Sequence, residues 1–159
     1  MKKILLLLIS AVLMLTSCNS PDTDKPGGSQ PALTPGELYE KLTQAGLFDG
    51  DDSPIMIDIW EDNLSDHFVF PEDAESFIAK EAGISSIFIQ LIIIQAKSGK
   101  ENDVHSAMTE HQSRLTDDAF YPQGQQAAAA SIVGISNNII YLICDIRSAE
   151  IEAELLKHL

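Results

Sequence analysis

Two histidines, His105 and His111, are the first residues whose type and spacing suggest chemistry, because pairs of imidazoles bind metal ions. Both fall within residues 101–119, where the apolar residues have helical spacing. Six residues turn a helix through about 600°, which places the rings about 120° apart, whereas metal ligands on one helix lie three or four residues apart. We therefore expect no metal between them. His111, on the apolar stripe, is predicted to be a hydrogen-bonded core residue, and His105 to be solvated near Glu101.

The acidic run Asp49-Gly50-Asp51-Asp52 offers three carboxylates in four residues, and carboxylates are the hard oxygen ligands that Ca²⁺ prefers. The run lacks the spacing of an EF-hand loop, and Asp and Gly are also ordinary turn residues. A solvated acidic turn is therefore the favoured interpretation. The 24 Asp and Glu residues contain close pairs that would suit glycoside hydrolysis, but the sequence singles out no pair. We predict no metal ion and no cofactor.

The candidate nucleophiles lack the context that would activate them. Ser131 and Ser136 have no glycine-elbow pattern around them and no histidine in a suitable context. Cys144 lies inside the apolar run Ile139–Ile146, where a small buried thiol without a disulfide partner is expected. Gly99-Lys100 lacks the other residues of a phosphate-binding loop, so it is predicted to be a turn. No catalytic residue is predicted.

Three basic residues, Lys97, Lys100 and Arg114, stand out because the surface around the predicted core is otherwise acidic. One interpretation is a structural set of ion pairs, which the surplus of carboxylates favours. The other is a contact site for an anion or for the carboxylate of a peptide partner, for which guanidinium and ammonium groups are suitable donors. Both interpretations stay open at the level of the sequence.

Local signals predict the elements that position these residues. Thr34-Pro35-Gly36-Glu37 is a helix start with a capping box, and Gly46 is a suitable terminator in the left-handed conformation. The run Ile55–Trp60 predicts a short strand, and residues 62–68 predict one or two helical turns before Pro71. The domain is therefore expected to begin with a short amphipathic helix.

The core signal is stronger downstream. Ile84–Lys97 is apolar on both faces, which predicts a central strand covered on both sides. Glu101–Ala119 has the spacing of one long helix. Ser131–Ile135 and Ile139–Ile146 predict the two strands of a hairpin, because Ser136-Asn137-Asn138 suits a tight turn.

A closing helix follows, for which Ser148 is the predicted cap and Ile151 and Leu155 the apolar face. The resulting order, strand, helix, strand, strand, helix, predicts an α+β class: a small single domain with an antiparallel or mixed sheet packed by helices. A split arrangement like half of a ferredoxin-like fold is one candidate topology.

The N-terminus has the pattern of a secretion signal. Lys2 and Lys3 precede Ile4–Leu15, an apolar run of 12 residues broken only by Ser10. As a helix this run would reach about 18 Å, against about 30 Å for the hydrocarbon core of a bilayer. Residues 1–17 are therefore predicted to be a signal peptide and not a transmembrane helix.

The segment Leu15-Thr16-Ser17-Cys18 resembles a lipobox, the pattern that lipoprotein-processing enzymes recognise. The resemblance implies cleavage between Ser17 and Cys18 and a thioether-linked diacylglycerol on Cys18, with palmitate as an acyl chain; two chains suffice for stable anchoring. The alternative is a secreted protein with an incidental cysteine at its cleavage site. Residues 18–33, with their prolines and glycines, are predicted to form a flexible tether, and residues 34–159 the domain.

The net charge excludes several partners. The chain carries −14, and removal of Lys2 and Lys3 with the signal leaves 8 basic against 24 acidic residues, or −16. Nucleic acid is not an expected partner, because counterion release requires clustered Lys and Arg. The same charge repels anionic headgroups, so attachment to a bilayer must come from a covalent lipid. We expect the domain on the outer, extracytoplasmic face of the cell membrane.

Three runs within residues 62–159 carry a family resemblance: Pro71-Glu72-Asp73 before Phe77-Ile78, the strand and turn Ile92–Lys100 leading into Val104, and Asn138–Ile143. In these runs the chain resembles a family of small Gram-positive lipoproteins, common in clostridia, that is described only as a domain of unknown function. The resemblance implies an apolar strand, Ala-Lys-x-Gly-Lys, and a charged helix with an arginine, here Arg114. It implies no activity, ligand or catalytic residue. The chain departs from the family pattern at Gln125–Ala130.

These observations favour a surface-tethered, non-enzymatic interaction or binding module, with an envelope protein or peptide as its partner. The alternative is a cell-envelope hydrolase that uses paired carboxylates. Two acidic side chains that face one cleft about 5–9 Å apart would favour the hydrolase. An exposed apolar patch would favour a protein partner.

Overall fold

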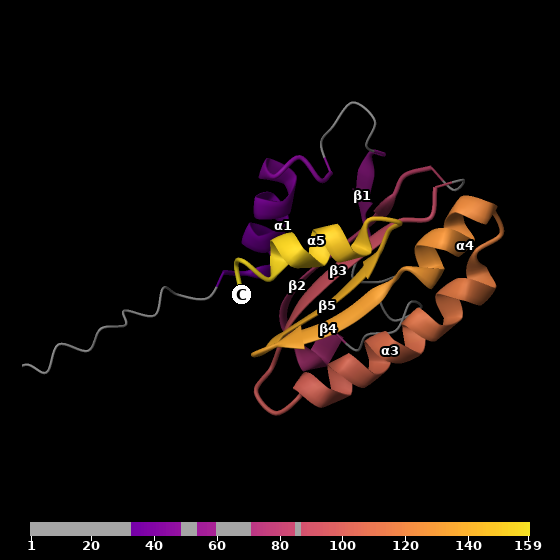
Figure 1. Ribbon diagram of the computed structural model, residues 1–159. Helices are drawn as coiled ribbons and strands as arrows, with labels where there is room; N and C mark the ends of the chain where they lie inside the picture. The colour runs from indigo at the N-terminus through magenta and orange to yellow at the C-terminus, as the bar shows by residue number, and fades with distance from the viewer. Residues whose placement is uncertain (1–32, 49–53, 60–70, 85–86) are drawn as a thin grey trace, which may run out of the picture. The chain divides into compact units, whose positions relative to one another are not determined.

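A computed structural model describes residues 33–48, 54–59, 71–84 and 87–159 (Figure 1). The chain divides between Gln30 and Pro31 into two units, and every described element belongs to the second. In chain order the elements are α1 (Pro35–Gln44), β1 (Met56–Asp58), the 3₁₀ turn η1 (Pro71–Asp73), β2 (Ala74–Ala82), β3 (Gln90–Ala96), α3 (Glu101–Asp118), α4 (Pro122–Ala129), β4 (Ile132–Ser136), β5 (Ile139–Cys144) and α5 (Ser148–Leu155).

The described strands form one antiparallel sheet in the order β1-β2-β3-β5-β4. Strand β5 lies between β3 and β4 and is antiparallel to both, so β3 and β4 run parallel to each other. The connection from β3 to β4 contains α3 and α4. This is the split arrangement that the sequence suggested; the α+β class is confirmed, and the order from β3 to α5 is as predicted apart from the additional helix α4.

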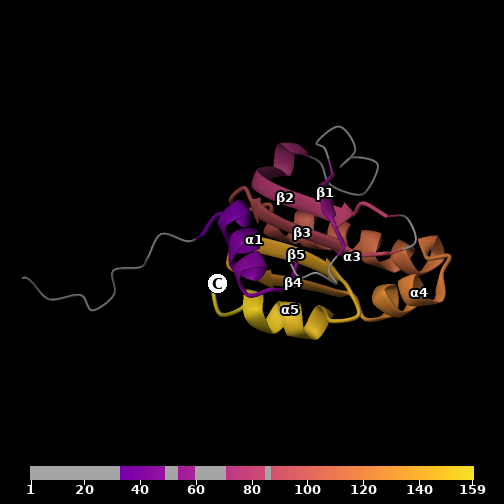
Figure 2. The same cartoon turned by 90° about the horizontal axis from the view of Figure 1, so that it is seen from above.

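Helices cover both faces of the sheet. Ile92 and Ile94 of β3 pack with α3 and α4, whereas Leu91 and Ile93 pack with α1 and α5, and all four side chains are fully buried. Figures 1 and 2 show α1 and α5 together on one side of the strands. A strand that is buried on both faces needs apolar residues at consecutive positions, which is the pattern of β3. The predicted central strand is thus confirmed, although it begins at Gln90 and not at Ile84.

The first helix begins as predicted. The hydroxyl of Thr34 accepts a hydrogen bond from the Glu37 amide at 3.3 Å, and the Thr34 amide donates to the Glu37 carboxylate at 2.8 Å. Pro35 occupies the first helical position, where no amide proton is needed. Gly46 follows the helix with φ +79°, a conformation that favours glycine. The capping box and the terminator are both confirmed.

The predicted hairpin is also present. Ser136 pairs with Ile139, which leaves Asn137 and Asn138 as the two turn residues. Asn137 has φ 54°, in the left-handed region that asparagine tolerates. Strand β5 is buried along its whole length because it lies inside the sheet.

Three features of the fold differ from the sequence-based expectations. Strand β2 was not predicted as an element, and neither was α4, which is built mainly of Ala and Gln. Ser148 was predicted to cap the last helix, and this is wrong: the capping position is Arg147, and Ser148 is the first helical residue. Its hydroxyl instead lies within hydrogen-bonding distance of the Ile143 and Asp145 carbonyls. The predicted helical turns at 62–68 fall outside the described residues.

Candidate binding groove

An open groove of about 730 Å³ lies at the end of the sheet where β2 ends and β3 begins. We call it the sheet-end groove. One wall is formed by β1, the end of β2 and the segment that leads into β3, and the other by the corner between α3 and α4. Its lining residues are Ile57, Glu81–Gly83, Ile87–Gln90, Asp118, Phe120, Tyr121 and Gly124.

Close packing of α4 on the segment before β3 shapes the floor of the sheet-end groove. A Cβ atom on Gly124 would lie 3.0 Å from the Cβ of Phe88. The absence of a side chain at Gly124 therefore lets the first turn of α4 sit directly against Phe88. Pro122 starts this helix at its first position, so the turn before it, with Phe120 and Tyr121, is held at the mouth of the groove.

A second pocket of about 420 Å³, the side pocket, adjoins the sheet-end groove. It shares Ile87, Phe88 and Ile89 with the sheet-end groove. Its remaining lining comes from Pro54, from α4 and from the segment after β5: Gln123, Gln126, Ala127, Asp145, Ile146 and Arg147. The two hollows are thus neighbours, and the wall between them is apolar.

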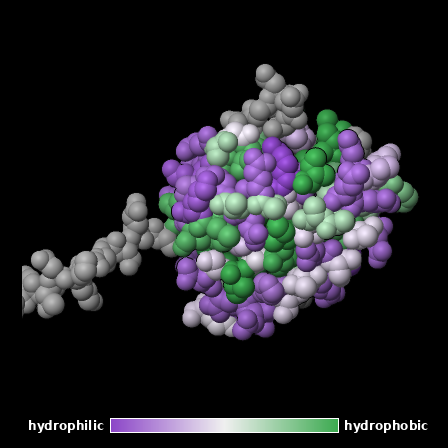
Figure 3. Space-filling view, in the orientation of Figure 1, coloured by the Kyte–Doolittle hydropathy of each residue, from purple (hydrophilic) through white to green (hydrophobic). Residues whose placement is uncertain are grey.

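The rim of these hollows is unusually apolar for a surface. Of the eight large hydrophobic side chains that are exposed among the described residues, six line the hollows or flank Gly83: Ile55, Ile57, Ile84, Phe120, Tyr121 and Ile146. Phe120 is 89% exposed and Ile146 66%. Figure 3 shows hydrophobic residues at the surface toward the upper right, near the ends of β2 and β5. Exposed apolar residues gathered in one place mark a site of interaction.

The charged residues of the sheet-end groove are both acidic. They are Glu81, at the end of β2, and Asp118, at the end of α3. Helix α3 ends on Asp117 and Asp118 with no basic residue in its last turn. Since the carbonyl end of a helix is itself negative, these two aspartates oppose the helix dipole. The carboxylates of Glu81 and Asp118 thus give the groove lining an acidic character that does not serve the stability of α3.

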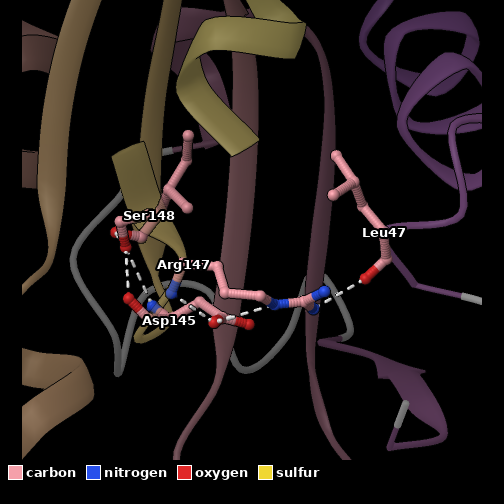
Figure 4. A network of polar contacts seen from close by, with 5 residues as sticks. Leu47, Asp145, Arg147 and Ser148 are labelled. Carbon is pink, nitrogen blue, oxygen red and sulfur yellow. Dashed lines mark hydrogen bonds and ion pairs between the residues drawn. The ribbon is translucent and has the colours of Figure 1, made fainter. Parts of the chain in front are cut away.

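A polar network holds the side pocket together (Figure 4). The Oδ1 atom of Asp145 accepts a hydrogen bond of 2.7 Å from the Arg147 amide and lies 3.6 Å from the Arg147 Nε. The Nη2 of Arg147 donates to the Leu47 carbonyl at 2.9 Å, which ties the segment after β5 to the end of α1. The Ser148 hydroxyl accepts from the Asp145 amide at 3.0 Å. Asp145 is 1% exposed, and its Oδ2 has no hydrogen-bond partner in the described structure.

A thiol, an imidazole and an amide lie near the sheet-end groove, but they do not form a nucleophilic site. Cys144 pairs with Gln90 across the sheet, and the Gln90 Oε1 lies 2.9 Å from the His111 Nε2. Burial, and then the charge of Asp145, raises the pKa of the Cys144 thiol to about 12. The thiol therefore stays protonated at neutral pH and is a poor nucleophile. The predictions of a buried Cys144 and of a hydrogen-bonded His111 in the core are confirmed.

Of the basic residues singled out in the sequence, Lys97 and Lys100 lie at the other end of β3 from the sheet-end groove, and Arg114, one helical turn before Asp118, is not among its lining residues. Lys97 follows the other end of β3, where its ammonium donates to the Glu72 carbonyl. The Lys100 ammonium lies 3.1 Å from Asp73 Oδ1 and 3.2 Å from Asp103 Oδ2, and these hydrogen bonds raise its pKa. This geometry supports the ion-pair interpretation for Lys100. Arg114 comes fourteen residues later along α3, about 21 Å at the helical rise, so the three do not converge.

Within the described residues, no group of three or more His, Cys, Asp or Glu side chains could hold a metal ion. The candidate calcium run Asp49-Gly50-Asp51-Asp52 lies outside these residues, and so do Ser17 and Cys18. Of the helices that are described, none combines the length and the apolar character needed to cross a bilayer.

Sequence reasoning missed the sheet-end groove because its walls come from segments far apart in the chain. The available signal was the pair Phe120-Tyr121 directly after Asp117-Asp118 and before Pro122. Two aromatic residues in a short connection between helices have no core face to fill, so they mark an exposed apolar site.

Comparison with known proteins adds information at the N-terminus. Residues 1–19 match the family model for the prokaryotic membrane lipoprotein lipid attachment site. No curated protein and no solved structure gives a significant match to the chain. The match supports a membrane-anchored prokaryotic lipoprotein.

Proposed function

We propose that the chain is exported, cleaved between Ser17 and Cys18, and anchored through acylated Cys18 on the outer face of the cell membrane. The observation that carries this proposal is the lipid attachment site at residues 1–19. The position of the cysteine after a 12-residue apolar run supports the cleavage site. Two acyl chains on one cysteine suffice for stable anchoring.

The experiment replaces each of the two cysteines in turn in the native bacterium. In Cys18→Ala, unprocessed precursor should accumulate and metabolic labelling with an acyl-chain probe should disappear. Cys144→Ala is the matched control, because it removes the other cysteine of the chain and should keep the label. Acyl labelling that persists in Cys18→Ala would contradict the anchor.

The domain that this anchor holds is, we propose, a non-enzymatic binding module that uses the sheet-end groove. The support is the apolar rim around it, with Phe120 and Tyr121 at its mouth. In Figures 1 and 2 the start of α1 and the C-terminus lie on the opposite side of the domain from α4. The groove is thus at the other side of the domain from the start of α1, and we propose that it receives an envelope protein or peptide.

Photo-crosslinking from a defined position tests this proposal. A benzophenone side chain is introduced at Phe120 in the lipoprotein produced by the native bacterium, and a matched one at Ile135. Ile135 is also exposed but lies on β4, outside the groove. A discrete crosslinked partner is expected from position 120 and not from 135. Equal products, or none, from the two positions would contradict a binding role for the groove.

A cell-envelope hydrolase is the second candidate, because Glu81 and Asp118 line one groove. Two carboxylates are the usual catalytic pair in glycoside hydrolysis. Exposure works against this function, since Asp118 is exposed and a general acid needs a water-poor environment. Release of soluble fragments from purified cell wall that is abolished by Glu81→Gln and by Asp118→Asn would establish the hydrolase in place of the binding module.

We further propose that residues 62–159 belong to the small Gram-positive lipoproteins of unknown function that the chain resembles. In support, the characteristic run Ile92–Lys100 spans most of β3 and the turn that precedes α3. Gly99 of this run has φ +83°, a backbone conformation that favours glycine, which explains why the Ala-Lys-x-Gly-Lys pattern has a glycine at this position.

A further inference from the structure

We infer that the sheet-end groove and the side pocket together bind an extended polypeptide segment that combines apolar with basic side chains. This inference rests on the proposed function as a binding module and names the chemistry of its partner.

The apolar part of the partner follows from the wall that the two hollows share. Ile87, Phe88 and Ile89 line both of them, while Phe120 and Tyr121 stand exposed at the mouth of the sheet-end groove. Aromatic side chains have few rotatable bonds, so they lose little conformational entropy on binding, and they are typical anchors of protein interfaces. Apolar side chains of a partner would remove this surface from water.

The basic part follows from the charges that face the groove. Glu81 and Asp118 are the carboxylates among its described lining residues, and neither forms an ion pair within the described structure. Asp117 and the carbonyl end of α3 add to the negative potential there. Basic side chains would be attracted to this site and acidic ones repelled.

The side pocket contributes a hydrogen-bond acceptor and no net charge, because Asp145 and its ion-pair partner Arg147 both line it. Asp145 lines it, and the buried Oδ2 of this residue has no hydrogen-bond partner in the described part of the chain. A buried carboxylate oxygen without a partner is costly, and a donor on a ligand would remove that cost. Gln123 and Gln126 of α4, which also line the side pocket, offer further polar groups.

The shape of the site favours a polypeptide over a compact ligand. The sheet-end groove and the side pocket are both open to solvent, and Ile87, Phe88 and Ile89 line both of them. A ligand that fills both must pass across these three residues, as an extended chain with side chains on alternate faces can. The bilayer surface is a poor occupant, because anionic headgroups would be repelled by Glu81 and Asp118.

The test uses the mature lipidated protein in phosphatidylcholine nanodiscs, with empty nanodiscs as the blank. Three labelled, end-capped ten-residue peptides serve as probes: alternating Leu and Lys, alternating Leu and Glu, and alternating Ser and Lys. Fluorescence anisotropy at physiological ionic strength measures their affinity. Saturable binding is expected for the Leu/Lys peptide, at least about tenfold weaker binding for Ser/Lys, and none for Leu/Glu.

Two double variants separate the groove from the bulk charge of the protein. Glu81→Gln with Asp118→Asn should weaken Leu/Lys binding by about tenfold. Glu40→Gln with Glu150→Gln removes the same charge from exposed positions on α1 and α5 and should leave the affinity unchanged. Equal losses in both double variants would overturn the inference, and so would equal binding of the Leu/Glu peptide. Circular dichroism establishes that each variant is folded.

The inference and the proposed function fail in different ways. If crosslinking from position 120 captures a partner but the Leu/Lys peptide does not bind the groove, the binding module stands and the basic-apolar specificity is wrong. If crosslinking from position 120 matches that from position 135, the groove itself is not the binding site.

Discussion

The phenol ring of Tyr141 lies across Gly134, its direct partner on the neighbouring strand. A Cβ atom on Gly134 would overlap the Cζ and the hydroxyl oxygen of Tyr141, so no side chain fits beneath the ring. The hydroxyl donates to the Glu152 carboxylate at 2.8 Å. One aromatic residue thus joins β4, β5 and α5.

Gly134→Ala should destabilise the domain by about 1–3 kcal/mol, because the added methyl group must displace the ring and its hydrogen bond to Glu152. Urea unfolding followed by circular dichroism measures the loss. The control is Gly36→Ala in α1, where a Cβ meets nothing within 4 Å. That change should stabilise by roughly 0.5–1 kcal/mol, since alanine favours the helix. Similar effects of the two substitutions would contradict the close packing at Gly134.

Ile93→Asp should unfold the domain. Ile93 is fully buried in the central strand β3, and an aspartate there would place an unpaired carboxylate in the core at a cost of several kcal/mol. Loss of cooperative thermal unfolding is the expected readout. Ile55→Asp is the control, because Ile55 is 76% exposed, and its cost should stay within about 0.5 kcal/mol. A cooperative transition retained in Ile93→Asp would refute the central position of β3.

Thr34→Ala should cost about 1 kcal/mol through loss of the cap. Hydrogen bonds from the Thr34 backbone and side chain hold the pKa of Glu37 below its ordinary value of 4.5. Because folding lowers the pKa of Glu37, its ionised carboxylate adds its full contribution to the stability of the folded protein at pH values above the ordinary pKa. This contribution is lost as the pH falls through the lowered pKa of the folded state. Unfolding measured from pH 6 to pH 3 should therefore show the gap between wild type and Thr34→Ala narrowing toward acid. Thr34→Ser keeps the cap and should follow the wild type.

The Cys144 thiol should resist modification in the folded protein. Its pKa is raised to about 12 from an ordinary value of 9.0, so a thiol reagent at pH 8 should react only after unfolding. Because folding raises the pKa of Cys144, the folded state favours the protonated thiol. The contribution of this group to stability is therefore complete below pH 9 and is lost as the pH rises toward 12. Cys144→Ala should flatten the fall of stability between pH 9 and 11. Rapid labelling of the native protein would contradict the burial.

The sequence predicted those elements whose signals are local. The capping box of α1, the two-faced apolar pattern of β3 and the Asn137-Asn138 turn each depend on neighbouring residues, and all three are present. Strand β2 was missed because Glu75, Lys80 and Glu81 interrupt its apolar pattern.

Helix α4 was missed for a related reason. Its Ala and Gln residues form no apolar stripe, and only its contact with the sheet buries Ala127 and Ala128. The sheet-end groove was beyond sequence reasoning, since Ile57, Glu81, Phe88 and Asp118 meet only through the pairing of β1, β2 and β3 and the packing of α3. The role of Ser148 could not be predicted from the sequence either. A serine hydroxyl can form hydrogen bonds with nearby backbone groups both as a helix cap and within a turn, and the residue type does not distinguish the two.

The position of β5 inside the sheet has a consequence for export. The central pairing joins Ile93 to Tyr141 across 48 residues of chain, so the sheet cannot close until β5 is present. If the chain is exported from its N-terminus, as we propose, β3 therefore lacks its β5 neighbour until residues 139–144 have emerged. Closure of the sheet is then a late step, which is compatible with passage of an unfolded polypeptide through a narrow translocation channel.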